Sequence, residues 1–439
     1  MLPTDQFKEL EQRLLKIPNG WGKEGILREA VNLSKENRKP ESEWGNSHIH
    51  IRPNFSSLLG AFHAVLKGVA EEASYLEISN FFDPFAYNDG FGRVCLIGGI
   101  VPIASTELMA IVDSELVDIL KSELGVEGVE GIKINDKTPG RIYIIISGYN
   151  PNKIIPDASF SRMFGIRKAQ HERTVKIAEK LSGYTSKNLV YGLDRRGWLE
   201  DNPSLFQERY VADIAHSTIQ RKIDKDKGNM EGELKKLGIT LAAGQSYESK
   251  ADVQEAIRNN LFKKPGQPAY IKQTKDEFYN LSEVFKLAKE LDGIVKIPLV
   301  CNGKDFSDID ESPEKVMKFC EVVGKHYNSG IHAIQLIPIR NDNETVKRFV
   351  TAFYNAGYLI DLGTEHNDGR ERPIMPLHKD GTRIGKEIWE MVNKTPYVEL
   401  VQSNPTLGVP FLSSGQRTIF SREQCADIGK IYAERIKAP

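Results

Sequence analysis

Cysteine is scarce in this sequence, with four residues among 439 and no CxxC pair. Such wide spacing disfavours both a disulfide framework and a zinc ribbon. No apolar run approaches the ~18 residues that a membrane helix needs, and the longest, Val94 to Ala104, contains two glycines. The first residues alternate charge and leucine without a contiguous apolar core, unlike a secretory signal. We therefore expect a soluble cytoplasmic protein with no membrane partner.

An excess of charge of either sign is also missing, because 59 Lys and Arg residues face 60 Asp and Glu residues. The net charge of −1 argues against binding of nucleic acid by bulk electrostatic attraction. The sequence contains no GxxxxGK[ST], no GxGxxG after an expected strand, no GxSxG and no HExxH. The P-loop, Rossmann, α/β-hydrolase and zinc-protease interpretations therefore have no motif to support them.

Strands and helices alternate in two separate parts of the chain, 46–150 and 291–439, after a helical segment over 1–45. The strands expected there are His48–Ile51, Tyr75–Ser79, Ile100–Ala104, Ile142–Ile146, Gly293–Val300, Ala333–Pro338 and Tyr358–Gly363. The helices between them are Ser57–Glu72, Leu108–Leu124, Pro313–Tyr327 and Glu344–Ala356. Alternation of this kind is typical of βαβ units and predicts a parallel sheet or a barrel.

Residues 151–290 follow a different pattern, which is mostly helical and includes a highly charged tract at 221–236. Helical spacing covers Arg167–Leu181, Ser204–Ile223, Asp252–Leu261 and Glu277–Leu291. We therefore expect an α/β fold, a distorted TIM-like β/α barrel, with a helical insertion at 151–290. The insertion would either cap the mouth of the barrel or form a dimer surface, which would make the protein a homo-oligomer.

In a β/α barrel, the chemistry gathers at the carboxyl ends of the strands and in the loops after them. His48 and His50, in NSHIHIR, fall on the first expected strand. Residues i and i+2 of a strand point to the same face, so both imidazoles can approach one cation. The alternative is a pair of partly buried histidines that are satisfied by ordinary polar neighbours.

Two polar side chains follow the next expected strands. Glu107, in IVPIASTEL, is a possible cation ligand. Its alternative role is to cap the helix that we expect after it or to interact with the dipole of that helix. Asn80, in LEISNFFD, is an ordinary strand-end residue unless it replaces a ligand.

The pentapeptide GTEHN, 363–367, follows another apolar strand and places Glu365 and His366 at a strand–loop junction. The sequence Asn-Asp-Gly at 367–369, which overlaps the end of this pentapeptide, is also typical of an ordinary turn. Arg340 follows the strand AIQLIP, and Arg52 follows the two histidines. Either arginine could pair with a phosphate or carboxylate of a substrate, or form a surface salt bridge.

The order of these motifs resembles the PHP (polymerase and histidinol phosphatase) superfamily over about 46–147 and 293–370. The resemblance implies a distorted seven-stranded β/α barrel and a metal-dependent phosphoesterase that binds cations with histidines and carboxylates. His48 and His50 match the opening HxH of the family, Glu107 matches its glutamate, and GTEHN matches its closing GSDxH. The positions that align with its other motifs are Ser79-Asn80-Phe81, the neighbourhood of Tyr143, and Val300-Cys301-Asn302-Gly303.

Several of these positions depart from the family pattern, which argues against a cluster of three cations. The non-matching residues are Asn80, Phe81, Cys301 and Asn367. The resemblance leaves one metal site made of His48, His50, Glu107 and Glu365, with His366 or Cys301 as possible replacements. Two histidines and two carboxylates suit a divalent zinc, manganese or iron ion better than calcium.

Three functions are compatible with such a site. The first is a metal-dependent hydrolase that acts on a small anionic ester, most readily a phosphoester, with an activated water. In that enzyme Glu107, Glu365 and His366 would serve catalysis, and Arg52 or Arg340 would hold the anion. The second is a metal-dependent isomerase or lyase for sugars or sugar acids. The third is a barrel that has lost its ligands and acts as a binding protein.

Overall fold

The computed structural model describes residues 28–34, 44–50, 69, 73–81, 95–96, 99–185, 208–301, 309, 312–364, 375–408, 410–412 and 419–437. Its centre is one sheet with the strand order β1-β2-β3-β4-β6-β7-β8. These strands are β1 (Trp44–His50), β2 (Ala73–Phe81), β3 (Val101–Ile111), β4 (Arg141–Ser147), β6 (Ile294–Leu299), β7 (Ala333–Leu336) and β8 (Leu359–Leu362). The two-residue strand β5 (Tyr279–Asn280) pairs with β3 outside this path.

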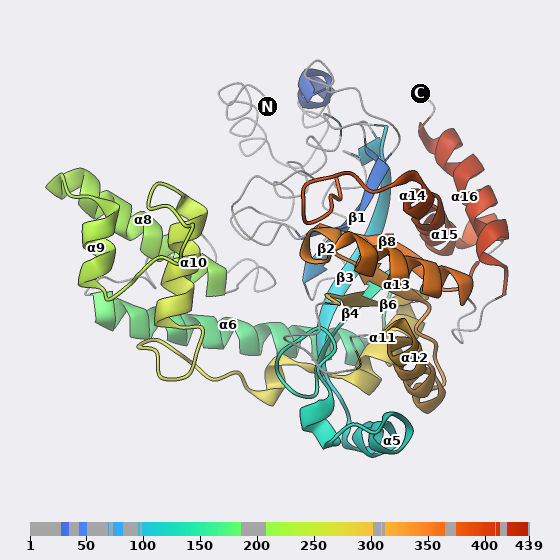
Figure 1. Ribbon diagram of the computed structural model, residues 1–439, viewed down its shortest axis with the longest axis horizontal. Coiled ribbons are helices and arrows are strands. Elements are labelled where there is room, and N and C mark those ends of the chain that lie inside the picture. Colours follow the sequence, from blue (N-terminus) through green and yellow to red (C-terminus); the bar gives the residue numbers. More distant parts are fainter. Residues whose placement is uncertain are drawn as a thin grey trace.

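The sheet curls towards a barrel, because its first and last strands, β1 and β8, contact each other (Figure 1). Strands from both sides of the helical segment belong to this one sheet, and its main path has seven strands. The prediction of a distorted TIM-like β/α barrel is therefore confirmed. Two independent domains with separate sheets would have contradicted it.

Strand β4 departs from simple strand–helix alternation, because it runs antiparallel to both β3 and β6. After β3 the chain passes through α5 (Ser114–Leu124) and η2 (Gly128–Gly131) without crossing back over the sheet. Val112 N donates to Gly140 O at 2.8 Å, so β4 begins beside the end of β3. A strand that starts there can only run back along its neighbour.

The outer face of the sheet is apolar and carries a layer of helices. These are α5, α11 (Leu281–Leu291), α12 (Pro313–Tyr327), α13 (Asn343–Asn355) and α14 (Lys386–Val392). Their buried side chains join strand residues such as Val295, Ile334 and Ile360 in one hydrophobic core. Successive side chains of a strand point to opposite faces of the sheet, so every second strand residue contacts this helix layer.

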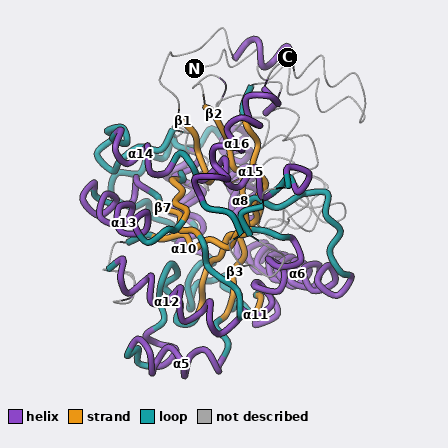
Figure 2. The backbone as a smooth tube through the Cα atoms, turned by 90° about the vertical axis from the view of Figure 1, so that its right-hand side faces the viewer, coloured by secondary structure: helices purple, strands orange, loops and turns teal. Residues whose placement is uncertain are grey.

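The inner face of the sheet is apolar mainly where α15 (Thr395–Gln402) and α16 (Arg422–Lys437) cover it (Figure 2). The first residues of β6, β7 and β8 pack there against Val398 of α15: Ile294, Ala333 and Leu359. Two positions further along, the inward residues are polar and buried: Lys296, Gln335 and Asp361. The two helices therefore close the amino-terminal end of the barrel below a layer of polar side chains.

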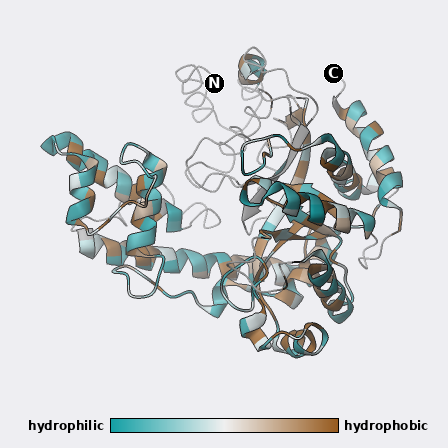
Figure 3. Ribbon diagram, in the orientation of Figure 1, coloured by the Kyte–Doolittle hydropathy of each residue, from teal (hydrophilic) through white to brown (hydrophobic). Residues whose placement is uncertain are grey.

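A helical lobe projects from the barrel along α6 (Asp157–Thr185), the long helix in Figure 1. Its other helices are α8 (Glu208–Asp226), α9 (Met230–Lys236) and α10 (Lys250–Leu261). They share a hydrophobic core separate from that of the barrel, with Leu181, Ile214 and Ile257 at its centre. In Figure 3 the lobe helices are coloured mostly as hydrophilic, with hydrophobic residues between the hydrophilic ones. No helix of the described residues is both long and apolar enough to span a membrane.

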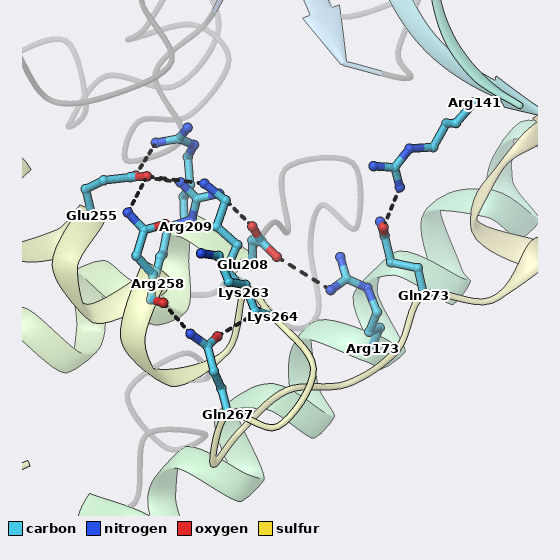
Figure 4. Close-up of polar contacts among 11 residues, drawn as sticks. Arg141, Arg173, Glu208, Arg209, Glu255, Arg258, Lys263, Lys264, Gln267 and Gln273 are labelled. Atoms are coloured by element: carbon cyan, nitrogen blue, oxygen red, sulfur yellow. Dashed lines mark hydrogen bonds and ion pairs between the residues drawn. The ribbon is translucent and has the colours of Figure 1, made fainter. Parts of the chain in front are cut away.

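Ion pairs fasten α6, α8 and α10 to one another (Figure 4). Arg258 lies between Glu208 and Glu255, at 2.7 Å from each carboxylate. Arg173 of α6 reaches Glu208 at 3.6 Å and Glu277, next to β5, at 2.6 Å. Because β5 belongs to the barrel sheet, Arg173 ties the lobe to the barrel. The four-segment division of the chain itself stays a prediction.

Strand β3 is longer than the sequence suggests. We expected it to end at Ala104 and a helix to begin at Leu108, but the strand continues to Ile111 and α5 begins at Ser114. Nearly every residue of β3 is buried, because both its faces are covered. A continuous apolar run of this kind does not distinguish a strand from the start of a helix.

We predict that Gly429→Ala destabilises the protein by about 1–3 kcal/mol, the usual range for overpacking. A Cβ atom at Gly429 of α16 would lie 2.2 Å from the backbone oxygen of Tyr397 in α15, so the two helices would have to separate. Urea unfolding followed by circular dichroism measures this change.

The matched control is Gly183→Ala, near the end of α6, where a Cβ atom meets nothing within 4 Å. Alanine in a helix is favoured over glycine by roughly 0.5–1 kcal/mol, so this variant should be slightly more stable than wild type. Equal stability of the Gly429 variant and wild type would show that α15 and α16 do not pack as described.

Candidate functional site

The strand order brings the predicted ligand segments side by side. His48 and His50 lie on β1, Asn80 lies on β2, and Glu107 lies on β3, while Glu365 comes three residues after the end of β8. Since β8 contacts β1, these strands form one continuous run, β8-β1-β2-β3. All four run in the same direction, because β8 is parallel to β7 and β6, and β6 and β3 are both antiparallel to β4, so their carboxyl ends lie at the same edge of the barrel.

The strand register adds detail to this arrangement. His50 stands opposite Ser79 on β2, and Ser79 stands opposite Ser105 on β3. Glu107 lies two residues further along β3. The side chains of His48, His50, Asn80 and Phe81 lie outside the described residues, as do Arg52, Glu365, His366 and Asn367 entirely. The four-ligand metal site therefore stays a prediction that the backbone topology accommodates.

Glu107 is the predicted ligand whose side chain the structure describes. It lies within β3, opposite Phe81 on one side and Ile145 on the other, and is 7% exposed. The next helix, α5, begins seven residues later and has Asp113 at its N-cap position. The alternative role of Glu107 as a helix cap is therefore wrong. A carboxylate held this deep in a barrel is more consistent with a site residue than with a solvated surface group.

Tyr143 lies on β4, where its direct partner on β3 is Met109. Glu107, two residues before Met109, is therefore the diagonal neighbour of Tyr143. Burial, followed by the nearby Asp136, raises the pKa of the Tyr143 hydroxyl, and Glu107 adds a smaller contribution in the same direction. The hydroxyl therefore stays protonated near neutral pH. Asn135 fixes this region by donating to Tyr143 O at 2.9 Å and to Pro298 O at 2.8 Å.

Other sequence candidates lie around the same end of the barrel. Arg340 ends the short helix η6 (Pro338–Arg340) after β7, and its side chain is exposed. Cys301 follows β6, is buried, and has a positive φ of 49°. His332 lies before β7, at the opposite end, where its ring packs edge-on against Phe411. Of these three, Arg340 and Cys301 are at the end where barrel chemistry occurs.

Beneath this edge lies a buried ionic cluster that the sequence analysis did not identify. It consists of Glu77 on β2, Lys296 on β6, Asp361 on β8 and Glu399 on α15, each at most 1% exposed. The three carboxylates offer oxygens within 4.8 Å of one another. We call these four residues the Lys296 cluster. It connects three strands of the barrel with the helix that closes the amino-terminal end.

The ammonium group of Lys296 occupies the centre of this cluster. Its Nζ lies 2.8 Å from Glu77 Oε2 and also contacts Asp361 Oδ2 and Glu399 Oε1. An ammonium has three N–H donors, so three carboxylates satisfy it completely. Ser147 of β4 donates to Glu399 at 2.7 Å. The three carboxylates are spaced like metal ligands, but the lysine already supplies their cation.

The charges of the Lys296 cluster do not balance unless protons bind. Three carboxylates and one ammonium sum to −2, in a place without solvent. Burial, together with the neighbouring Glu399, raises the pKa of Asp361 to about 8 although Lys296 opposes this shift. Burial likewise raises the pKa of Glu77. Protons on these two carboxyls would make the cluster neutral, and Glu77 Oε1 and Asp361 Oδ1, which have no hydrogen-bond partner, are free to carry them.

A sequence signal for this cluster exists in retrospect. Each of its four residues is a single charge within an otherwise apolar stretch: YLEIS, IVKIPL, LIDL and YVELV. A charge at a core position of a strand must be paired, because an isolated buried charge is too costly. One lysine and three acids among such positions predict an ionic cluster, but pairing them needs the strand order.

The fold and its inner face define a curled β/α barrel protein with a polar, ionic interior. No family model matches the chain, and no curated protein does either. It is structurally similar to an amidohydrolase from Chromobacterium violaceum, solved with sulfate and without metal, at 13% identity and a TM-score of 0.44. That similarity covers 79% of this chain and 96% of the other.

A second similar structure is a candidate metal-dependent phosphoesterase from Bifidobacterium adolescentis. Here the identity is 13% and the TM-score 0.45, over 80% of this chain and 97% of the other. Both TM-scores lie below 0.5, so neither similarity assigns an activity to this chain.

We predict that Lys296→Met lowers the free energy of unfolding by about 3–5 kcal/mol, as expected when one partner of a buried ionic group is removed. The matched control is Lys286→Met, because Lys286 pairs with Glu290 at 3.7 Å on the exposed side of α11. That change should cost less than about 1 kcal/mol. Urea unfolding near neutral pH compares the two variants.

The effect of Lys296→Met should also depend on pH. Without the ammonium, which opposes the shift, the folded-state pKa values of Glu77 and Asp361 rise further above the values of about 4 in the unfolded chain. Folding then takes up protons, so the stability deficit should shrink as pH falls from about 7 to about 5. If the two lysine variants lose the same stability at every pH, the Lys296 cluster is not formed as described.

Proposed function

We propose that this protein is a metal-dependent hydrolase that acts on a small anionic ester, most readily a phosphoester. The observation that carries the proposal is the adjacency of β8, β1, β2 and β3. Those strands carry or precede His48, His50, Glu107 and Glu365. We infer that these residues, which are far apart in sequence, meet at one edge of the barrel, where this fold class supports catalysis.

The donor set at this edge fits a divalent cation of the zinc, manganese or iron type. His48 and His50 would provide imidazole nitrogens, and Glu107 and Glu365 would provide carboxylate oxygens. The position of Glu107 supports this role, because its carboxylate is buried within β3 rather than held in solvent. The other acidic group, in the Lys296 cluster, is already satisfied by an ammonium.

A bound cation would polarise the ester and lower the pKa of a coordinated water towards neutrality. The protein itself has three tasks. Arg340, exposed after β7, binds the negative charge of the substrate together with Arg52. His366, which follows Glu365 in the sequence, would transfer a proton. The Lys296 cluster holds β2, β6 and β8 together beneath the site, so that the ligand-bearing strands keep their spacing.

We predict that purified protein binds about one divalent ion per chain and hydrolyses a generic phosphomonoester such as p-nitrophenyl phosphate. Glu107→Gln preserves the shape of the side chain and removes its charge, so it should weaken metal binding and activity by about 100-fold or more. Loss of a group that only hydrogen-bonds to a metal ligand already costs up to about 100-fold, and Glu107 is a proposed ligand itself. His48→Ala should have the same effect. Elemental analysis and a phosphoester panel measure both quantities.

The matched control is Glu130→Gln, an exposed glutamate on η2 that should leave both quantities unchanged. Metal binding without hydrolysis of any ester in the panel would favour the isomerase or lyase alternative. Wild-type metal content and activity in Glu107→Gln would overturn the proposed site.

A further inference from the structure

The first turns of α6 expose a patch of large apolar side chains. Phe160 and Phe164 are each 49% exposed, and Ile154, just before the helix, is 91% exposed. The opposite face of the same helix contributes Met163 and Ile166 to the barrel core. The two phenylalanines therefore lie on the face of α6 that points away from the barrel. Exposed apolar clusters of this kind commonly mark interaction surfaces.

Two charged residues flank this patch on the same face of α6. Asp157, Phe160, Phe164 and Lys168 are spaced by three, four and four residues, so they form one stripe along the helix. Asp157 and Lys168 are both exposed, and neither forms an ion pair within the described part of the chain. The stripe thus has an acidic end, an apolar centre and a basic end.

This charge pattern is complementary to that of a second copy of α6 running in the opposite direction. If two copies of α6 pack antiparallel about a two-fold axis between Phe160 and Phe164, Asp157 of each copy stands opposite Lys168 of the other. The phenylalanines then meet at the centre. A two-fold interface requires this kind of self-complementarity, since the same surface serves both partners. A parallel pairing would instead place like charges opposite each other.

We propose that the protein forms a two-fold homodimer through this stripe of α6, with the two helices antiparallel. The occupant of the patch is a second copy of the chain, because the order of charges matches that occupant. This surface is independent of the barrel edge proposed for hydrolysis, so the two proposals stand or fall separately.

Sedimentation velocity from about 1 to about 100 µM, a range that brackets weak specific association, tests the dimer. Wild type should shift from monomer to dimer, and Phe164→Asp should stay monomeric. Asp157→Lys and Lys168→Asp, made separately, each place like charges opposite each other twice. Each should raise the dissociation constant about ten-fold or more, from two reversed surface ion pairs.

Mixing the two charge variants is the most discriminating arm. One chain then carries only positive charges at the two positions and the other only negative charges, so the mixture should form a heterodimer at least as tight as wild type. The double variant should recover homodimers for the same reason. The control is Lys176→Glu, on an exposed part of α6 outside the stripe, which should behave as wild type.

Any one of three results would overturn the proposal. One is a wild-type protein that remains monomeric throughout the concentration range. The second is a dimer whose affinity is unaffected by the single charge changes, and the third is a mixture of the two variants that does not associate. Circular dichroism of every variant excludes unfolding as the cause of a lost dimer.

Discussion

The interior of this barrel depends on the ion pairs that the ammonium group of Lys296 forms with three carboxylates. The ammonium binds carboxylates from β2, β8 and α15. Its own strand, β6, is separated from β2 in the sheet by β3 and β4. Distant parts of the chain therefore meet at one atom. A buried ionic group stabilises less than its contacts suggest, because desolvation offsets most of the Coulomb attraction. Removing one member is nevertheless costly, so the cluster fixes which strands and helix come together.

This constraint explains how the two ends of the barrel differ. The amino-terminal end is closed by apolar packing of α15 and α16, with Glu399 reaching up to the ammonium. The carboxyl-terminal edge carries Glu107 and the strands of the predicted histidines. Since the Lys296 ammonium already contacts all three carboxylates of the lower acidic group, we propose a metal ion only at the upper edge. The polar interior therefore divides into a structural layer and a layer available for chemistry.

Much of the fold was predictable from the sequence, because period-two alternation and helical spacing are local signals. The helix Pro313–Tyr327 matches its expected bounds, and a single sheet unites both halves of the chain. The length of β3 and the reversed direction of β4 were not predictable, since both depend on what covers a strand and where the chain re-enters the sheet. The Lys296 cluster was missed for the same reason: each charge is visible, but its partners follow only from the strand order.

The central claim is that the barrel holds a metal at its carboxyl-terminal edge and a lysine, not a metal, in its centre. A crystal grown with Mn²⁺ and measured for anomalous scattering tests this claim directly. The proposed function predicts an anomalous peak beside the Glu107 carboxylate and none among Glu77, Asp361 and Glu399. A peak inside the Lys296 cluster with the ammonium displaced, or an edge without any peak, would contradict it.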